Sequence, residues 1–336
     1  MNPMNAIAAA SHPDPYPYYR RLLEGPALSF DPRLEQWVAS RDKVIEVVLA
    51  NPHCIVRPTS EPVPKAIAGS SAGAVFARLV RMNEGCLHAD GKRAISDALA
   101  AVDMSALRTR SEQLAGLLGE RNGLLRGVAI TRWIFDLPTY VIADLLGFNE
   151  TQLPQVARWT SDFVRCLSPL STPDQLTSAA RAARALQDCM ARVLKVDGLA
   201  QRASQTNWID QDALIANMIG LLSQTHEASA GLIGNCIVAL LEQPEIQQRL
   251  RDDPQLTAAF VQEVARSDPP VQNTRRFVAQ QTSVAGVSLQ PGDMMLLLAV
   301  AGRGEQCNAE AGLFLLDRKE GKLTGFGHGR HDCRHF

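Results

Sequence analysis

Apolar residues recur three and four positions apart through most of the chain between residues 66 and 250, the spacing of amphipathic helices. Asp136, Leu137 and Pro138 predict the start of one helix, and Gly147 predicts its end. The whole pattern predicts helices over residues 73–83, 88–102, 104–120, 136–147, 151–168, 173–195 and 210–242.

Shorter patterns, typical of strands, lie on both sides of this helical stretch. Before it, they predict strands over residues 27–30 and 36–39 and helices over 18–24 and 42–50. After it, they predict strands over residues 276–279, 283–285, 287–289 and 294–300, with turns at Gly286 and at Pro291-Gly292. Since no repeat, linker or low-complexity tract divides the chain, we expect one mainly α domain over residues 1–336 with a small β region.

The segment 213–241 is apolar and long enough to cross a bilayer, but its centre is polar. Glu227 would place a charge at bilayer depth, which is costly. A buried central helix of a globular protein is the better interpretation. Its polar centre, residues 223–227, must then face something polar, such as a ligand or water.

Composition excludes several classes of protein. The chain has 34 Lys and Arg against 35 Asp and Glu, so no single-sign field is available to hold nucleic acid or an anionic membrane surface. With 46% hydrophobic residues, the chain is not disordered. Seven cysteines without a CxxC pair, and no signal peptide before them, indicate a reduced, cytoplasmic protein. We expect six of them to be buried, with Cys333 the exception.

The last residues, Gly325 to Phe336, place three glycines ahead of Cys333. Glycines let backbone approach a large planar group, and Arg330 and His331 supply positive charge that stabilises a thiolate. Cys333 is therefore a candidate ligand for heme iron. Two alternatives are a metal cluster of His328, His331, Cys333 and His335, whose spacing matches no common zinc site, and a plain surface tail.

Phe326, Gly329 and Cys333, at the spacing FxxGxxxC, resemble the heme-binding loop of cytochrome P450 heme-thiolate enzymes. Glu263 and Arg266 share one helix face and can form a charge-assisted pair; followed by Pro269-Pro270, they resemble the ExxR helix and turn of that family. The resemblance is to soluble bacterial members and extends over residues 14–26, 37–38, 44–52, 136–147 and 225–229. It implies a P450-like fold without an anchor helix.

The resemblance also implies roles for individual residues. Cys333 is expected to be the axial thiolate of heme b, in a loop with Phe326, Gly329 and His331. The heme propionates are expected to contact His88, Lys92 or its neighbour Arg93, Arg276 and His331. Glu227 is expected to be the distal acid, with Ser229 or a water replacing a missing alcohol. The expected substrate pocket includes Gln224, Ala228, Val271, Asn273 and Thr274.

The sequence also departs from the family pattern. It ends three residues after Cys333, so we expect a fold that lacks the helix after the axial cysteine. Ala228 follows Glu227 where an alcohol is usual, and Gln224 and Thr225 replace small residues. Leu313 stands where an arginine usually completes the network of Glu263 and Arg266, which predicts a pair without its third member. Residues 302–314 have lost most of their usual identities.

The resemblance favours a monooxygenase that oxidises a small organic molecule, as in secondary metabolism. Electrons would come from NAD(P)H through a ferredoxin reductase and a ferredoxin. One alternative is a heme-thiolate enzyme that uses peroxide or catalyses a rearrangement, because losing the alcohol at residue 228 harms oxygen activation most. The other is a non-catalytic, degenerate homologue that binds heme.

Overall fold

The computed structural model describes residues 5–122, 127–168, 170–298, 314–318 and 327–333. The chain forms two compact units. The helical unit comprises the described residues of Glu61–Ala230, and the sheet unit comprises those of residues 1–60 and 231–333. The boundary between residues 230 and 231 falls inside the long helix α11 (Gln211–Glu242). Each unit has its own buried apolar clusters.

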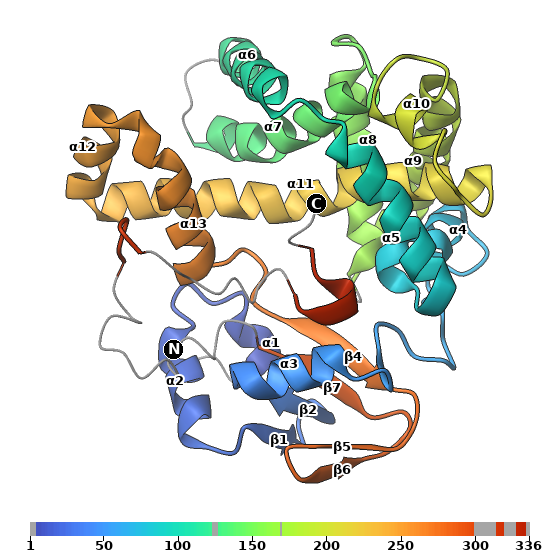
Figure 1. Ribbon diagram of the computed structural model, residues 1–336, viewed down its shortest axis with the longest axis vertical. Helices are drawn as coiled ribbons and strands as arrows, with labels where there is room; N and C mark the ends of the chain where they lie inside the picture. The colour runs from blue at the N-terminus through green and yellow to red at the C-terminus, as the bar shows by residue number, and fades with distance from the viewer. Residues whose placement is uncertain (1–4, 123–126, 169, 299–313, 319–326, 334–336) are drawn as a thin grey trace. The chain divides into compact units, whose positions relative to one another are not determined.

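The helical unit consists of helices, and each predicted helix between residues 73 and 195 overlaps an observed one (Figure 1). Its helix α9 begins where Thr172 accepts a hydrogen bond from the Gln175 backbone and Gln175 accepts one in return, a capping box. Its elements are α4 (Ser71–Arg78), η1 (Val80–Met82), α5 (Gly85–Ala100), α6 (Met104–Asn122), α7 (Val128–Leu146), α8 (Leu153–Val164), η2 (Arg165–Leu167), α9 (Pro173–Val193), α10 (Leu199–Ala203) and the first part of α11.

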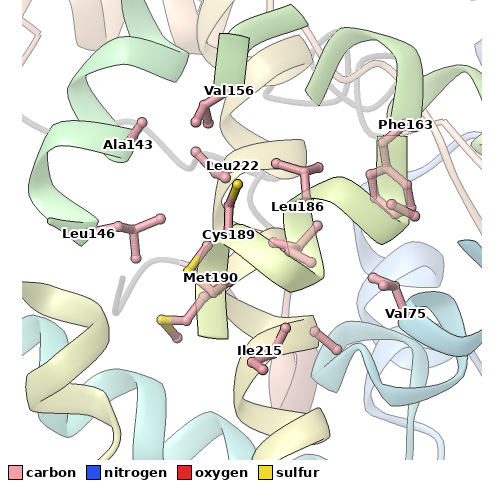
Figure 2. Close-up of a cluster of buried hydrophobic side chains, with 14 of the residues drawn as sticks. Val75, Ala143, Leu146, Val156, Phe163, Leu186, Cys189, Met190, Ile215 and Leu222 are labelled. Atoms are coloured by element: carbon pink, nitrogen blue, oxygen red, sulfur yellow. The ribbon is translucent and has the colours of Figure 1, made fainter. Parts of the chain in front are cut away.

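The core of the helical unit lies where α7, α8, α9 and α11 pack together (Figure 2). Phe163, Leu186 and Met190 are each completely buried there. Small residues of α9, among them Ala179 and Ala183, are equally buried and let neighbouring helices approach closely. This packing holds the first part of α11 against α7, α8 and α9.

Helix α7 differs from its prediction. It begins at Val128, so Pro138 lies inside the helix and does not start it. The preceding turns are helical because they pack against α6, where the Trp133 indole donates to the Ala115 carbonyl at 3.2 Å. The predicted end is confirmed: Gly147 adopts the left-handed conformation at φ 111° and its N–H returns to the last helical turn.

The sheet unit contains a five-stranded sheet in the order β1-β2-β7-β4-β3. Strands β2 and β7 pair in parallel, and the other neighbours pair antiparallel. A separate hairpin pairs β5 with β6, and its turn at Gly286 has φ 79°. The strands are β1 (Leu28–Asp31), β2 (Gln36–Ala39), β3 (Cys54–Ile55), β4 (Thr274–Val278), β5 (Thr282–Val284), β6 (Val287–Leu289) and β7 (Met294–Leu297).

The sheet unit also contains helices. Their bounds are α1 (Ala6–Ala9), α2 (Tyr16–Glu24), α3 (Asp42–Ala50), α12 (Pro244–Asp252), η3 (Pro254–Leu256), α13 (Thr257–Ser267) and η6 (Gly329–His331). Helix α3 and strand β6 match their predicted bounds, because proline, asparagine and glycine mark their ends. Across the described ranges, no helix is both long and apolar enough to span a bilayer.

Candidate functional site

The cysteine loop, residues 327–333, holds Cys333 at the end of a short 3-10 turn in the sheet unit. Gly327 and Gly329 adopt left-handed conformations, with φ of 85° and 67°. A Cβ atom on Gly327 would lie 2.9 Å from the His331 carbonyl oxygen, so this close turn requires glycine. The glycines that the sequence singled out therefore shape the loop. Phe326 lies outside the described residues.

Arg330 fixes the cysteine loop to the end of helix α3. Its guanidinium donates to the Asn51 carbonyl at 3.2 Å and to the Cys54 carbonyl at 3.0 Å. Both of these contacts come from Nη2, and Nη1 also donates to the Asn51 carbonyl at 3.3 Å. The role of Arg330 is thus structural, and the sequence did not indicate it.

Cys333 is exposed, and its Sγ lies 4.0 Å from the His331 carbonyl oxygen. Cys54, Cys166 and Cys236 are chemically quiet by comparison, because burial raises the pKa of each thiol to about 11. Cys189 is also buried, but Cys86 is exposed, so the expectation that every cysteine except Cys333 is buried is wrong there. The exposed Cys333 thiol is therefore accessible to a ligand.

Glu263 and Arg266 of α13 form the predicted ion pair. Arg266 Nε lies 2.7 Å from one carboxylate oxygen and Nη2 lies 2.6 Å from the other, a bidentate contact. The expectation that Leu313 leaves this pair without a third member is wrong, because Arg318 Nε donates to Glu263 at 3.2 Å. Leu313 itself lies outside the described residues.

The Glu263 carboxylate is only 3% exposed, yet it remains charged. Burial alone would raise its pKa, but hydrogen bonds from Arg266, the Leu315 backbone and Arg318 outweigh burial and lower the pKa. The network ties helix α13 to residues 314–318. It therefore fixes helix α13, which directly precedes the turn at Pro269-Pro270.

The expected pocket residues of the sheet unit lie in that turn and at the start of β4. Val271 is exposed, while Asn273 and Thr274 are half-buried. Arg276 follows them and is 6% exposed, with Nη1 donating to the Arg275 carbonyl at 2.8 Å. Helix α2 supports the turn, since the Tyr19 hydroxyl lies 2.7 Å from Gln272 Oε1.

The expected cationic contacts of the helical unit lie on α5. His88 is buried and Lys92 is half-buried, one helical turn apart on the same face. Arg93 is exposed and points about 100° away from Lys92 around the axis. This arrangement favours Lys92 over Arg93 as the second expected propionate contact, because Lys92 shares a helix face with His88.

The polar centre of α11 is part of one unbroken helix. The Glu227 side chain remains accessible to solvent; partial burial raises the pKa of its carboxyl, and nearby Arg81 opposes that effect. Gln224 is exposed and donates to the Gly220 carbonyl at 3.1 Å. Ala228 and Ser229 are half-buried. Ser229 lies about 160° from Glu227 around the axis, so the two side chains do not share a face.

His226 is a polar residue of this centre that the sequence did not assign. Its Nδ1 lies 3.1 Å from Thr139 Oγ1 of α7, and its ring lies 5.2 Å from the Phe135 ring. Burial lowers the pKa of the imidazole, which favours the neutral form. His226 therefore anchors the polar centre of α11 to α7.

The two units divide the candidate residues between them. The helical unit carries His88, Lys92, Arg93, Gln224, Glu227, Ala228 and Ser229. The sheet unit carries Glu263, Arg266, Val271, Asn273, Thr274, Arg276, Gly329, His331 and Cys333. In the part of the chain that the structure describes, no three His, Cys, Asp or Glu side chains gather to hold a metal ion. His335, one member of the alternative metal cluster, lies outside that part.

Curated relatives of this chain are bacterial cytochromes P450. Cytochrome P450 144 of Mycobacterium tuberculosis is 32% identical over 208 residues, which are 59% of this chain and 48% of that protein. The biotin biosynthesis cytochrome P450 of Bacillus subtilis is 26% identical over 239 residues, 66% of this chain and 59% of that protein. The chain thus spans about half to six-tenths of the length of these relatives. No family model matches it.

Solved P450 structures share the fold. CalO2 superimposes with a TM-score of 0.82 at 21% identity, covering 99% of this chain and 86% of that one. P450BioI in complex with a fatty-acyl carrier protein superimposes with a TM-score of 0.81 at 20% identity, covering 95% and 86%. The chain is a homologue of the bacterial cytochromes P450 and has their fold.

Proteins of this class bind heme iron through a cysteine thiolate. The sheet unit offers the required donors: an exposed thiol at Cys333, a glycine loop, and a buried guanidinium at Arg276 for a carboxylate. The helical unit adds His88 and Lys92. Since a soft sulfur ligand and cationic groups are what iron and the two propionates need, these residues fit heme b.

Proposed function

We propose that this protein is a heme-thiolate monooxygenase that oxidises a small organic molecule with O2. The exposed Cys333 thiol, at the end of a loop held by Arg330, is the observation that carries the proposal. Bound heme b supplies the redox-active iron that activates oxygen. Cys333 would hold the iron, and Arg276, His331, His88 and Lys92 would bind the propionates.

Glu227 has the properties of a proton donor. Its carboxyl is accessible to solvent, and partial burial raises its pKa, so the group holds a proton at higher pH than an ordinary glutamate. Because Ser229 faces a different direction, an ordered water would take the place of the missing alcohol. Substrate would contact Ala228, Gln224, Val271, Asn273 and Thr274.

The proposed electron source is a ferredoxin with its NAD(P)H-dependent reductase. Among the relatives, the vitamin D(3) 25-hydroxylase of Pseudonocardia autotrophica is 29% identical over 246 residues, and its name states a hydroxylation. Together with the biotin biosynthesis P450, it supports a small-molecule substrate in biosynthesis, and the proposed location is the cytoplasm.

Ala228 favours a second candidate function. An alanine cannot hydrogen-bond the proton relay, and this loss matters less to a heme-thiolate enzyme driven by peroxide or catalysing a rearrangement than to one that activates O2. Turnover with hydrogen peroxide, but none with ferredoxin and NADPH, would favour this candidate.

The decisive experiment measures heme bound per chain and the reduced carbon monoxide difference spectrum. The chain should bind one heme and give a strongly red-shifted Soret band. Cys333→Ser should abolish that band, while Cys86→Ser, which removes the other exposed thiol, should preserve it. A chain that folds but takes up no heme would refute both enzymatic candidates.

A further inference from the structure

A cavity of about 450 Å³ lies within the helical unit, lined by residues that the proposed oxidation does not use. Its volume is in the range of small-molecule sites. The walls come from α4, η1, the first turns of α5, residues 207–210 and the first turns of α11. Ala77, Val80, Leu87, Ile209 and Ala213 make them largely apolar.

Close packing and hydrogen bonds hold the walls of this cavity in place. Gly91 lets α5 approach η1, since a Cβ atom there would lie 2.3 Å from Val80 Cγ2. Asn217 accepts from the Val80 backbone at 2.8 Å and donates to the Arg78 carbonyl at 2.9 Å. The Trp208 indole donates to the Ala203 carbonyl at 2.9 Å, which fixes the ring in the wall.

The mouth of the cavity carries an excess of negative charge. Asp90 and Asp210 line it, and Asp212 lies beside them. Arg78 is 3.9 Å from Asp210 and 3.7 Å from Asp212, beyond hydrogen-bond distance in both cases. The lining and its edge therefore hold three carboxylates, Asp90, Asp210 and Asp212, against the single guanidinium of Arg78.

We propose that this cavity binds a small organic cation, a protonated or quaternary amine that carries an apolar group. The apolar group would fill the space beside Val80 and Ala213. The cationic end would lie at the mouth, near Asp90 and Asp210, where the Trp208 ring can also attract it. The exposed side chains of Leu87 and Ile209 would cover the apolar group when the cavity is occupied.

Cys86 provides a direct reporter of occupancy, because its exposed thiol lines the cavity. The experiment follows alkylation of Cys86 by iodoacetamide, read from the mass of the Cys86 peptide in the full-length protein. Benzyltrimethylammonium should slow the reaction several-fold, with a saturable dependence on concentration. Tetramethylammonium, which has the charge without the ring, and N,N-dimethylbenzamide, which has the ring without the charge, should protect weakly.

Two variants test the charge. Asp90→Asn should raise the concentration of benzyltrimethylammonium needed for half-protection about two- to fivefold, the effect of an exposed charge pair. Asp97→Asn, an exposed aspartate of α5 away from the cavity, should leave it unchanged. Absence of protection in the wild-type chain would overturn the site. Equal protection by the amide would overturn the preference for a cation, even if Asp90→Asn failed to fold.

Discussion

Glu227, Ala228 and Ser229 are consecutive in α11 but point in different directions, because each residue turns an α-helix by about 100°. Only residue 228 can supply an alcohol in the direction of the missing one. A serine one position later cannot replace it without a local change in the helix, and none is present.

Ala228→Thr is therefore expected to raise the fraction of consumed NADPH that appears as product, because the new hydroxyl can hydrogen-bond the proton relay. The measurement is product formed per NADPH consumed with a ferredoxin system. Ala228→Val is the matched control, since valine has the shape of threonine without its hydroxyl. An equal change in both variants would show that pocket shape, and not the hydroxyl, sets the amount of product formed per NADPH consumed.

At the scale of elements, the Glu263 network joins helix α13 to residues 314–318. Glu263 is 3% exposed and contacts two guanidiniums, so neutralising it removes a buried negative charge that both of them bind. Glu263→Gln is expected to lower the free energy of unfolding by about 3–5 kcal/mol. Glu242→Gln, an exposed glutamate at the end of α11, is the control and should change it little. Chemical denaturation gives both values.

The same network predicts a pH dependence. Because the pKa of Glu263 is lowered in the folded protein from its ordinary 4.5, the network contributes its full stability above that value. The stability is lost as pH falls below 4.5 towards the lowered folded-state pKa. The denaturation midpoint of the wild-type chain should fall more steeply in this window than that of Glu263→Gln. Parallel profiles would contradict the assignment.

Local patterns predicted most elements, because their signals lie within a few residues. Helix α3 ends before Asn51-Pro52 and β6 begins after Gly286, so both were predicted at their observed bounds. The prediction that a helix starts at Pro138 was wrong, because packing of α6 on α7 outweighed the preference of proline for a helix start. Arg318 contacts Glu263 across 55 positions, and no local spacing could show that contact. The hydrogen bond between His226 and Thr139 could not be predicted for the same reason, because 87 positions separate the two residues.

For the whole molecule, heme binding and folding are linked, because a group that binds only the folded chain stabilises it. Added heme should raise the thermal midpoint, with each tenfold excess over its dissociation constant adding about 1.4 kcal/mol. The comparison is calorimetry of the apo and heme-loaded chain. Cys333→Ser should reduce the shift and Cys86→Ser should not; a shift of equal size in all three would mean that heme binds elsewhere.

Arg330 reaches back across 279 positions to the Asn51 carbonyl. During synthesis on the ribosome, the helical unit is continuous in sequence and can fold as soon as residue 230 has emerged, whereas the sheet unit waits for its second half. The cysteine loop can close only after residues 327–333 have been made, because Arg330 binds the Asn51 and Cys54 carbonyls. The proposed capture of heme through Cys333 would therefore follow the synthesis of residues 231–333, on a chain whose helical unit can already be folded.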